Sequence, residues 1–238
     1  YLLVKAGSGL STFGSPSSPG VPDEFVKNTL VARFNDIDSV EEIFKKNANS
    51  VAAIILEPVP ANMGLVLPDE KFLNKLIDLA HSNKTLVIFD EVVSGYRLSL
   101  GGAQKVFNVR PDMTCIGKII GGGFPVGAFG GKKEIMSMLS PTGPVYQAGT
   151  LSGNPVAVAA GIRTIELLIE SNPKIYIDLE KKARYIKEGF ESEKINFINI
   201  NQFGSMLTFF FTKKKSIRNY SDVLSCDTNL YGKFFAII

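Results

Sequence analysis

The sequence predicts an α/β fold with a mostly parallel sheet, followed by a smaller α+β unit. In the first part of the chain, apolar runs of strand length alternate with amphipathic helical segments, an order typical of parallel strands joined by helical crossovers. Near residue 172 the alternation stops, and a helical segment rich in Lys and Glu leads into two strand-like runs. We therefore expect a large domain over residues 1–172, and a linking helix with a smaller domain over 173–238. Apolar residues make up 45% of the 238 residues, which is enough for a sizeable core.

Short apolar or β-branched runs predict the strands of the sheet. In chain order they occupy residues 29–34, 51–56, 85–90 and 113–116. The runs at 51–56 and 85–90 are apolar almost without interruption, so we expect both strands to be buried. Residues 6–23, before the first strand, are rich in Gly, Ser and Pro and predict a long loop of the kind that often serves as a lid.

Capping signals and apolar spacing predict the helices of the large domain. Asp38, with Glu41 three residues later, has the pattern of a helix start. Another helix opens near Pro68-Asp69. Its apolar positions share one helix face: Phe72, Leu73, Leu76, Ile77 and Ala80.

The last part of the chain is predicted to be helical and then extended. Asn154-Pro155 combines a good N-cap with a residue suited to the first turn, so a helix should run from here to about Glu170. A second helix is expected over about 174–192. Strand-like runs follow at 195–200 and 206–211.

Composition excludes several classes of function. Charged residues make up 21% and the net charge is +3, too mild a balance to indicate nucleic-acid binding. The run Lys213-Lys214-Lys215 is short and typical of a solvated turn. Two cysteines, Cys115 and Cys226, form no disulfide framework, which fits a reducing compartment, and Cys115 is expected to pack within an apolar stretch. No run approaches the roughly 18 apolar residues of a membrane span, and no signal peptide is visible.

The single histidine narrows the chemistry further. His81 leaves no histidine cluster for a metal, and at the end of an amphipathic helix it is expected at the surface rather than in a Ser-His-Asp triad. The chain has no GxGxxG, and Gly117-Lys118 lacks the other residues of a P-loop. We therefore expect neither a metal nor a nucleotide-type fingerprint.

Lysine chemistry remains, centred on Lys118. This residue lies between a short strand and a glycine run, and Asp90 ends the preceding apolar strand. Ligands of open α/β sheets bind beyond the carboxyl ends of the strands. A lysine and an aspartate there suit an imine with pyridoxal phosphate and a protonated ring nitrogen. The alternatives from the residues alone are a surface lysine before a turn, and an aspartate that caps a helix or pairs with Arg97 or Lys84.

Two stretches then resemble a known family. They are Asp90-Glu91-Val92-Val93-Ser94-Gly95-Tyr96-Arg97 and Pro111-Asp112-Met113-Thr114-Cys115-Ile116-Gly117-Lys118-Ile119-Ile120-Gly121-Gly122-Gly123-Phe124-Pro125-Val126-Gly127-Ala128. Together with their spacing they resemble the class III aminotransferases, pyridoxal-phosphate enzymes of fold type I. The resemblance implies a large domain built on a mostly parallel sheet of the seven-stranded type, and a small α+β domain.

Within that class, further stretches resemble the glutamate-1-semialdehyde 2,1-aminomutases. They are the segments at 4–9 and 15–22, Gly101-Gly102-Ala103-Gln104, and residues 143–155. That family converts (S)-4-amino-5-oxopentanoate to 5-aminolevulinate, a precursor of haem and chlorophyll, by intramolecular amino transfer. The cycle starts from the pyridoxamine form of the cofactor.

The resemblance also implies a role for each matching residue. Lys118 would form the imine and move protons, and Asp90 would bond the pyridine nitrogen. Val92 would pack on the ring, and Asn62 would bond its hydroxyl. Thr150 would reach the cofactor phosphate of a neighbouring subunit, which implies a homodimer. The remaining positions, Ser8, Tyr146, Gly7 and Gly9, would lie near the substrate or in the gate formed by residues 7–22.

Two other functions fit the same residues. One is a different class III enzyme, such as an ω-amino-acid or ornithine-type transaminase, which needs an external amino acceptor. The other is a pyridoxal-phosphate-binding protein without turnover. The chain begins at Tyr1 and stops in an apolar stretch, so we expect an internal piece of a longer protein, inactive alone, because the family's phosphate-binding turn and substrate-carboxylate arginine lie outside it. The family resemblance implies a cytoplasmic enzyme, or a plastid one in a plant or alga.

Overall fold

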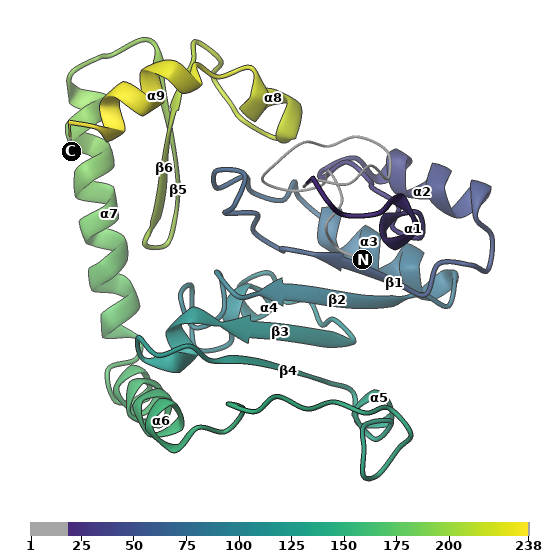
Figure 1. Ribbon diagram of the computed structural model, residues 1–238. Coiled ribbons are helices and arrows are strands. Elements are labelled where there is room, and N and C mark those ends of the chain that lie inside the picture. The colour runs from purple at the N-terminus through teal and green to yellow at the C-terminus, as the bar shows by residue number, and fades with distance from the viewer. Residues whose placement is uncertain (1–18, 238) are drawn as a thin grey trace.

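The structure is a computed structural model, and it describes residues 19–237. Its centre is a four-stranded sheet in the order β1-β2-β3-β4 (Figure 1). The strands are β1 (Ala53–Leu56), β2 (Leu86–Glu91), β3 (Met113–Gly117) and β4 (Gly127–Gly131). The first three strands run parallel, and β4 pairs antiparallel with β3. The expected α/β class with a mostly parallel sheet is therefore confirmed.

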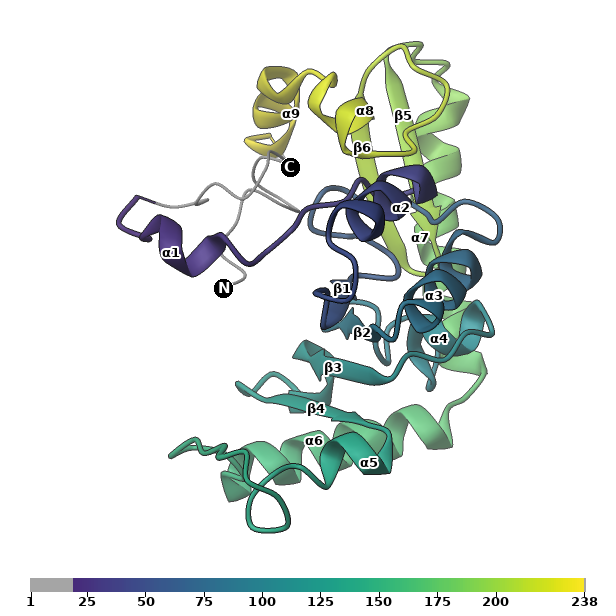
Figure 2. The same ribbon diagram turned by 90° about the vertical axis from the view of Figure 1, so that its right-hand side faces the viewer.

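Helices join and flank these strands. Up to β4 they are α1 (Asp23–Val26), α2 (Ile37–Lys46), α3 (Phe72–Ser82), α4 (Gly102–Val106) and the 3-10 turn η1 (Lys118–Gly121). After β4 come α5 (Lys133–Met136), α6 (Pro155–Glu170), α7 (Lys174–Ser192), α8 (Tyr220–Leu224) and α9 (Thr228–Phe235). Figures 1 and 2 both show α6 beside β4, at the edge of the sheet away from β1. None of the helices within 19–237 is both long enough and apolar enough to cross a membrane.

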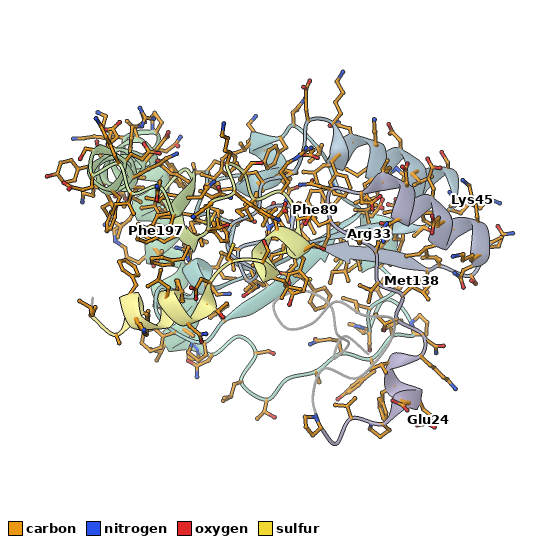
Figure 3. All side chains as sticks on the ribbon, turned by 90° about the horizontal axis from the view of Figure 1, so that it is seen from above. Glu24, Arg33, Lys45, Phe89, Met138 and Phe197 are labelled. Atoms are coloured by element: carbon orange, nitrogen blue, oxygen red, sulfur yellow. The ribbon has the colours of Figure 1, made fainter. Side chains whose placement is uncertain are left out.

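The core of the sheet lies between α3 and β2. The face predicted from apolar spacing is buried, and Phe72, Leu73, Ile77 and Ala80 pack in one cluster with Val87 and Phe89 of β2. Phe89 is fully buried and lies centrally in the view of Figure 3. Burying a side chain of this size stabilises the fold by about 1.5–3 kcal/mol. This packing holds β2 in place, and β2 ends in the acid pair Asp90-Glu91.

Three local predictions are wrong. Residues 29–34 form no strand, because no neighbouring strand among the described residues supplies the hydrogen-bonded ladder that an extended segment needs. The N-cap of α2 is Asp36, not Asp38, because the Asp36 side chain accepts from the Ser39 N–H. Neither β1 nor β2 is fully buried, since Ile55 keeps 41% and Leu86 keeps 37% of its surface exposed.

Two further boundaries are shifted: the helix expected from Pro68-Asp69 begins at Phe72, and the strand expected at 195–200 is Ile198–Phe203. The limits of the two long helices agree closely with the sequence. Asn154 caps α6 by accepting from the N–H groups of Val156 and Ala157, and α6 ends at Glu170. The second long helix, α7, has the expected limits. β4 was not predicted, because its sequence Gly-Ala-Phe-Gly-Gly has the composition of a turn.

The chain after α6 forms a second layer. Strands β5 (Ile198–Phe203) and β6 (Met206–Phe211) make an antiparallel two-stranded sheet, and α7 leads to it from α6 (Figure 1). Phe190 of α7 packs edge-on against Phe209 of β6, and Phe209 contacts Phe234 of α9. These aromatic contacts give the hairpin a core of its own.

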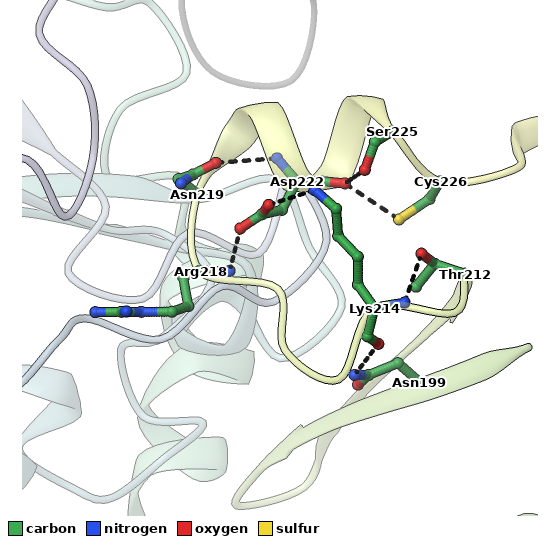
Figure 4. A network of polar contacts seen from close by, with 8 residues as sticks. All are labelled: Asn199, Thr212, Lys214, Arg218, Asn219, Asp222, Ser225 and Cys226. Carbon is green, nitrogen blue, oxygen red and sulfur yellow. Dashed lines mark hydrogen bonds and ion pairs between the residues drawn. The ribbon is translucent and has the colours of Figure 1, made fainter. Parts of the chain in front are cut away.

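A polar network orders the turn between β6 and α8 (Figure 4). The Asp222 carboxylate accepts from Lys214 Nζ at 2.6 Å and from the Arg218 N–H at 3.1 Å. Asn219 caps α8 by accepting from the Asp222 N–H. The bond from Lys214, followed by the bond from Arg218, holds the pKa of Asp222 below its usual value. The basic run therefore lies in an exposed turn, as expected, and Lys214 stabilises that turn.

The two layers also contact each other directly. Asn35 Nδ2 donates to Leu67 O and to Arg218 O, at 2.8 and 2.7 Å, and Asn35 Oδ1 accepts from the Asp69 N–H. An apolar cluster of Met63, Val66, Phe210 and Ile217 crosses the same boundary. The loop after β1 is thus held between the sheet and the C-terminal hairpin.

Candidate active site

The parallel strands bring the two main candidate residues to one edge of the sheet. Asp90 of β2 pairs in register with Cys115 of β3, and Lys118 follows the last residue of β3. Because parallel strands point their carboxyl ends the same way, Asp90 and Lys118 lie at the same edge. This is the arrangement that the sequence predicts.

Lys118 has an unusual backbone conformation. It is the first residue of η1 and its φ is +48°, in the left-handed region that glycine favours. A residue with a side chain pays roughly 1–2 kcal/mol for this conformation, and such residues cluster at functional sites. The Lys118 side chain is exposed at the sheet edge. Its amine is therefore open to a ligand.

Asp90 has no cationic partner among residues 19–237. Its Oδ1 accepts from the Val92 N–H at 3.0 Å, which ties the carboxylate to the turn after β2. The Arg97 guanidinium donates elsewhere, to Val93 O, and Lys84 forms no ion pair with Asp90. Burial, with a further contribution from the Asp90 charge, raises the pKa of the Cys115 thiol. Asp90 thus keeps a carboxylate oxygen for a cation.

Val92 and Asn62 extend the same edge. A Cβ atom on Gly117 would lie 3.3 Å from Val92 Cγ1, so Val92 packs directly over the end of β3. Asn62 lies in the loop after β1, where its Nδ2 donates to Glu57 Oε1 at 2.8 Å. Three consecutive parallel strands therefore place Asn62, Asp90 and Lys118 at their carboxyl ends.

The other predicted site residues are not brought into contact with these. Tyr146 is 83% exposed and Thr150 is exposed, both in the extended segment between α5 and α6 (Figure 1). Ser8, Gly7 and Gly9 lie outside the described residues, as does most of the expected gate.

Glu91 is the residue that sequence reasoning left without a role. It is 1% exposed, whereas its neighbour Asp90 is half-buried. Side chains alternate between the two faces of a strand, so the acid pair divides between the ligand edge and the protein interior. The alternation of side chains along β2 could have revealed this role of Glu91. It places Glu91 on the face opposite to Asp90, where a buried carboxylate needs hydrogen-bond donors.

A cavity of about 740 Å³ lies on the Glu91 side of the sheet. Its lining includes Glu91, Gln104 and Thr114, but neither Asp90 nor Lys118. The cavity is therefore distinct from the edge described above. Among the described residues, no group of three or more His, Cys, Asp or Glu could hold a metal ion.

The donor set at the edge fits one kind of ligand. It combines a primary amine, a carboxylate with no cationic partner among residues 19–237, an amide and an apolar side chain, on backbone that includes glycines. An amine bonds a carbonyl carbon, and a free carboxylate stabilises a protonated ring nitrogen. The edge therefore suits an aromatic aldehyde with a basic ring nitrogen.

The topology of the sheet agrees with the fold type I transferases. The chain belongs to the class III aminotransferase family, whose model, described as aminotransferase class-III, matches residues 5–225. It is 53% identical over 235 residues to the glutamate-1-semialdehyde 2,1-aminomutase of Thermosipho africanus, covering 98% of this chain and 55% of that protein. It is 51% identical to the enzyme of that name from Clostridium novyi, covering 98% and 54%. The chain thus spans about half the length of these curated relatives.

Solved structures agree on the fold. An omega-transaminase from Sphaerobacter thermophilus superposes with a TM-score of 0.81 at 31% identity, over 89% of this chain and 48% of that one. A glutamate-1-semialdehyde-aminomutase from Pseudomonas aeruginosa, in complex with PMP, has a TM-score of 0.74 at 23% identity, over 88% and 48%. At 23% identity, the similarity to the Pseudomonas aeruginosa structure supports the fold alone.

Proposed function

We propose that the whole protein is a glutamate-1-semialdehyde 2,1-aminomutase, an isomerase of tetrapyrrole biosynthesis. It moves the amino group within (S)-4-amino-5-oxopentanoate to give 5-aminolevulinate. The observation that carries the proposal is the edge where Asp90 at the end of β2, Lys118 after β3 and Asn62 in the loop after β1 lie at the carboxyl ends of adjacent parallel strands. The 48–53% identity to four aminomutases over 98% of the chain supports the choice of reaction.

Each residue of the edge has a separate task. Pyridoxal 5′-phosphate, or its pyridoxamine form, supplies an amino-group carrier and an electron sink when bound. The Lys118 amine would hold the cofactor through its carbonyl carbon, with release of the carbonyl oxygen as water, and would move protons. Asp90 would accept a hydrogen bond from the protonated ring nitrogen through Oδ2, because Oδ1 already accepts from the Val92 N–H. Val92 packs on the ring, and Asn62 hydrogen-bonds its hydroxyl group.

The residues away from the edge are assigned to the assembly and the substrate. Thr150 reaches the cofactor phosphate of the second subunit of a homodimer, which its exposed position supports. Tyr146, with Ser8, Gly7 and Gly9 of the gate, faces a small amino-aldehyde. No nucleic acid or membrane takes part, and the enzyme works in the cytoplasm. The division at residue 172 stays a proposal, supported by the separate β5–β6 sheet.

A related transaminase is the second candidate. The 31% identity and TM-score of 0.81 to an omega-transaminase favour it over a protein without turnover. The products distinguish the two enzymes. An aminomutase forms 5-aminolevulinate from the semialdehyde alone, whereas a transaminase needs a second amino compound and converts it as well.

The decisive experiment supplies the whole protein with the semialdehyde and no other amino compound. Formation of 5-aminolevulinate is expected, and Lys118→Ala should lower the rate by roughly 10²–10⁴-fold or more, because the proton-transfer group is lost. Lys75→Ala, an exposed lysine on α3, is the control and should keep its rate. Normal turnover by Lys118→Ala would refute the assignment. The 238-residue chain alone should show no turnover.

A further inference from the structure

Glu91 is a buried carboxylate with a full set of hydrogen-bond donors. Its Oε2 accepts from Ser94 Oγ at 2.8 Å and from the Ala103 N–H at 2.6 Å. Its Oε1 accepts from the N–H and from Nε2 of Gln104, each at 3.1 Å. Only 1% of the residue is exposed. A buried charge is tolerated when its oxygens are satisfied in this way.

All of these donors are neutral, and the surrounding backbone is shaped to the carboxylate. Within residues 19–237, no lysine, arginine or histidine forms an ion pair with Glu91. A Cβ on Gly102, whose φ is +65°, would lie 2.3 Å from Glu91 Oε2. A Cβ on Gly95 would lie 2.6 Å from Glu91 O, which accepts from the Gly95 N–H. The loops on both sides of Glu91 therefore close onto it.

The network reaches the strand that carries the lysine. Gln104 Nε2, bonded to Glu91, also lies 3.2 Å from Thr114 Oγ1 on β3. Glu91 itself pairs in register with Ile116 of β3. One buried carboxylate therefore links the end of β2, the start of α4 and β3.

We infer that Glu91 is a positioning residue for the proposed site, holding the ends of β2 and β3 so that Asp90 and Lys118 face the same ligand. The inference rests on the proposed function for the roles of Asp90 and Lys118. Glu91 touches neither ligand nor reacting atoms. It acts through Asp90, its neighbour in β2, and through the Gln104 bridge to β3.

The test variant is Glu91→Gln, which keeps the shape and replaces one oxygen by an NH₂ group. In the wild type, Glu91 Oε2 accepts from the Ala103 N–H and Glu91 Oε1 accepts from the Gln104 N–H. Either orientation of the new amide therefore sets a donor against a donor. The end of β2 should shift, and the Kd of the whole protein for pyridoxal 5′-phosphate should rise at least roughly tenfold, about 1.4 kcal/mol.

Asp112→Asn provides the matched control. Asp112 is also 1% exposed and accepts from three donors, the Val87 N–H, His81 and Lys132. It precedes β3, at the amino ends of the strands and away from the proposed site. This variant should lower the thermal unfolding midpoint yet leave the Kd within about threefold of wild type, the scatter expected between independent sites.

Three measurements on the whole protein separate the outcomes: the unfolding midpoint, the Kd for pyridoxal 5′-phosphate, and the fraction of Lys118 labelled after borohydride reduction. The inference holds if Glu91→Gln weakens binding and labelling while Asp112→Asn does not. It fails if both variants bind alike, or if Glu91→Gln loses only stability. Gln104→Ala, which removes only the side-chain bridge, should give a smaller effect of the same kind if Glu91→Gln does not fold. Equal borohydride labelling of the wild type and of Lys118→Ala, measured over the whole chain, would refute the proposed function instead.

Discussion

At the scale of single residues, the carboxylates of the sheet have unlike surroundings. Asp90 has no cationic partner among the described residues, Glu91 has neutral donors, and Asp112 has a cation. Asp90 and Lys118 could be predicted as candidate site residues because their residue types and strand positions indicate a chemistry. It could not assign partners to Glu91 or Asp112, because those depend on loops brought together by folding.

The Asp112 carboxylate makes the free energy of unfolding depend on pH in the acid range. Burial alone would raise its pKa, but hydrogen bonds from Lys132, the Val87 N–H and His81 outweigh burial and lower the pKa to about 2. Because the pKa of Asp112 is lower in the folded state than the 3.8 of the unfolded state, its carboxylate stabilises the fold at pH values above 3.8. This stabilisation is lost as the pH falls through about 2.

The expected outcome is a difference between wild type and Asp112→Asn that narrows in acid. At pH 5 the wild type should be more stable by about 2 kcal/mol, and most of this advantage should vanish between pH 4 and about 2. Urea unfolding of the two proteins at matched pH values measures it. A pH-independent difference would contradict the role of the Asp112 charge.

At the scale of elements, the turn η1, which begins with Lys118, packs against α6. A Cβ on Gly161 of α6 would lie 2.3 Å from Ile120 O of η1, and a Cβ on Gly122 would lie 2.7 Å from Ala160 O. Only glycine permits this approach of two backbones. The limits of α6 were predictable from its caps, but its contact with η1 was not, because the glycines there read simply as a turn.

Gly161→Ala should therefore displace η1 and Lys118 with it. Because the clash is with backbone, the cost should be about 1–3 kcal/mol in stability, with weaker cofactor attachment. Gly189→Ala in α7 is the control, since nothing lies within 4 Å of its Cβ. Better helix propensity should make that variant more stable by about 0.5–1 kcal/mol. Thermal unfolding and borohydride labelling of both variants check this, and equal behaviour would show that η1 does not rest on Gly161.

At the scale of the whole molecule, Asn35 joins the sheet layer to the C-terminal layer. It bonds Leu67, Asp69 and Arg218 from a φ of +61°. The α/β alternation and the change near residue 172 indicated two parts. Their mutual contact was not predictable, because it joins residues distant in the sequence.

Two substitutions at Asn35 separate bonding from backbone strain. Asn35→Gly loses the side-chain hydrogen bonds and should destabilise the protein by about 1–3 kcal/mol. Asn35→Ala should cost roughly 1 kcal/mol more, because alanine lacks the freedom of glycine at positive φ. Denaturant unfolding gives both values. If Ala is no worse than Gly, strain at this position is unimportant.

The division of Asp90 and Glu91 between two faces limits how β2 can change in length. Inserting or deleting one residue within the strand would exchange the faces of all residues beyond that point. Only one of the two places would then keep a carboxylate, and the other would be taken by a neighbouring residue of the chain, so the site edge or the buried network would lose its acid. Natural length variation in this family should therefore fall in the loops before β2 and after α4, and hardly ever within the strand itself.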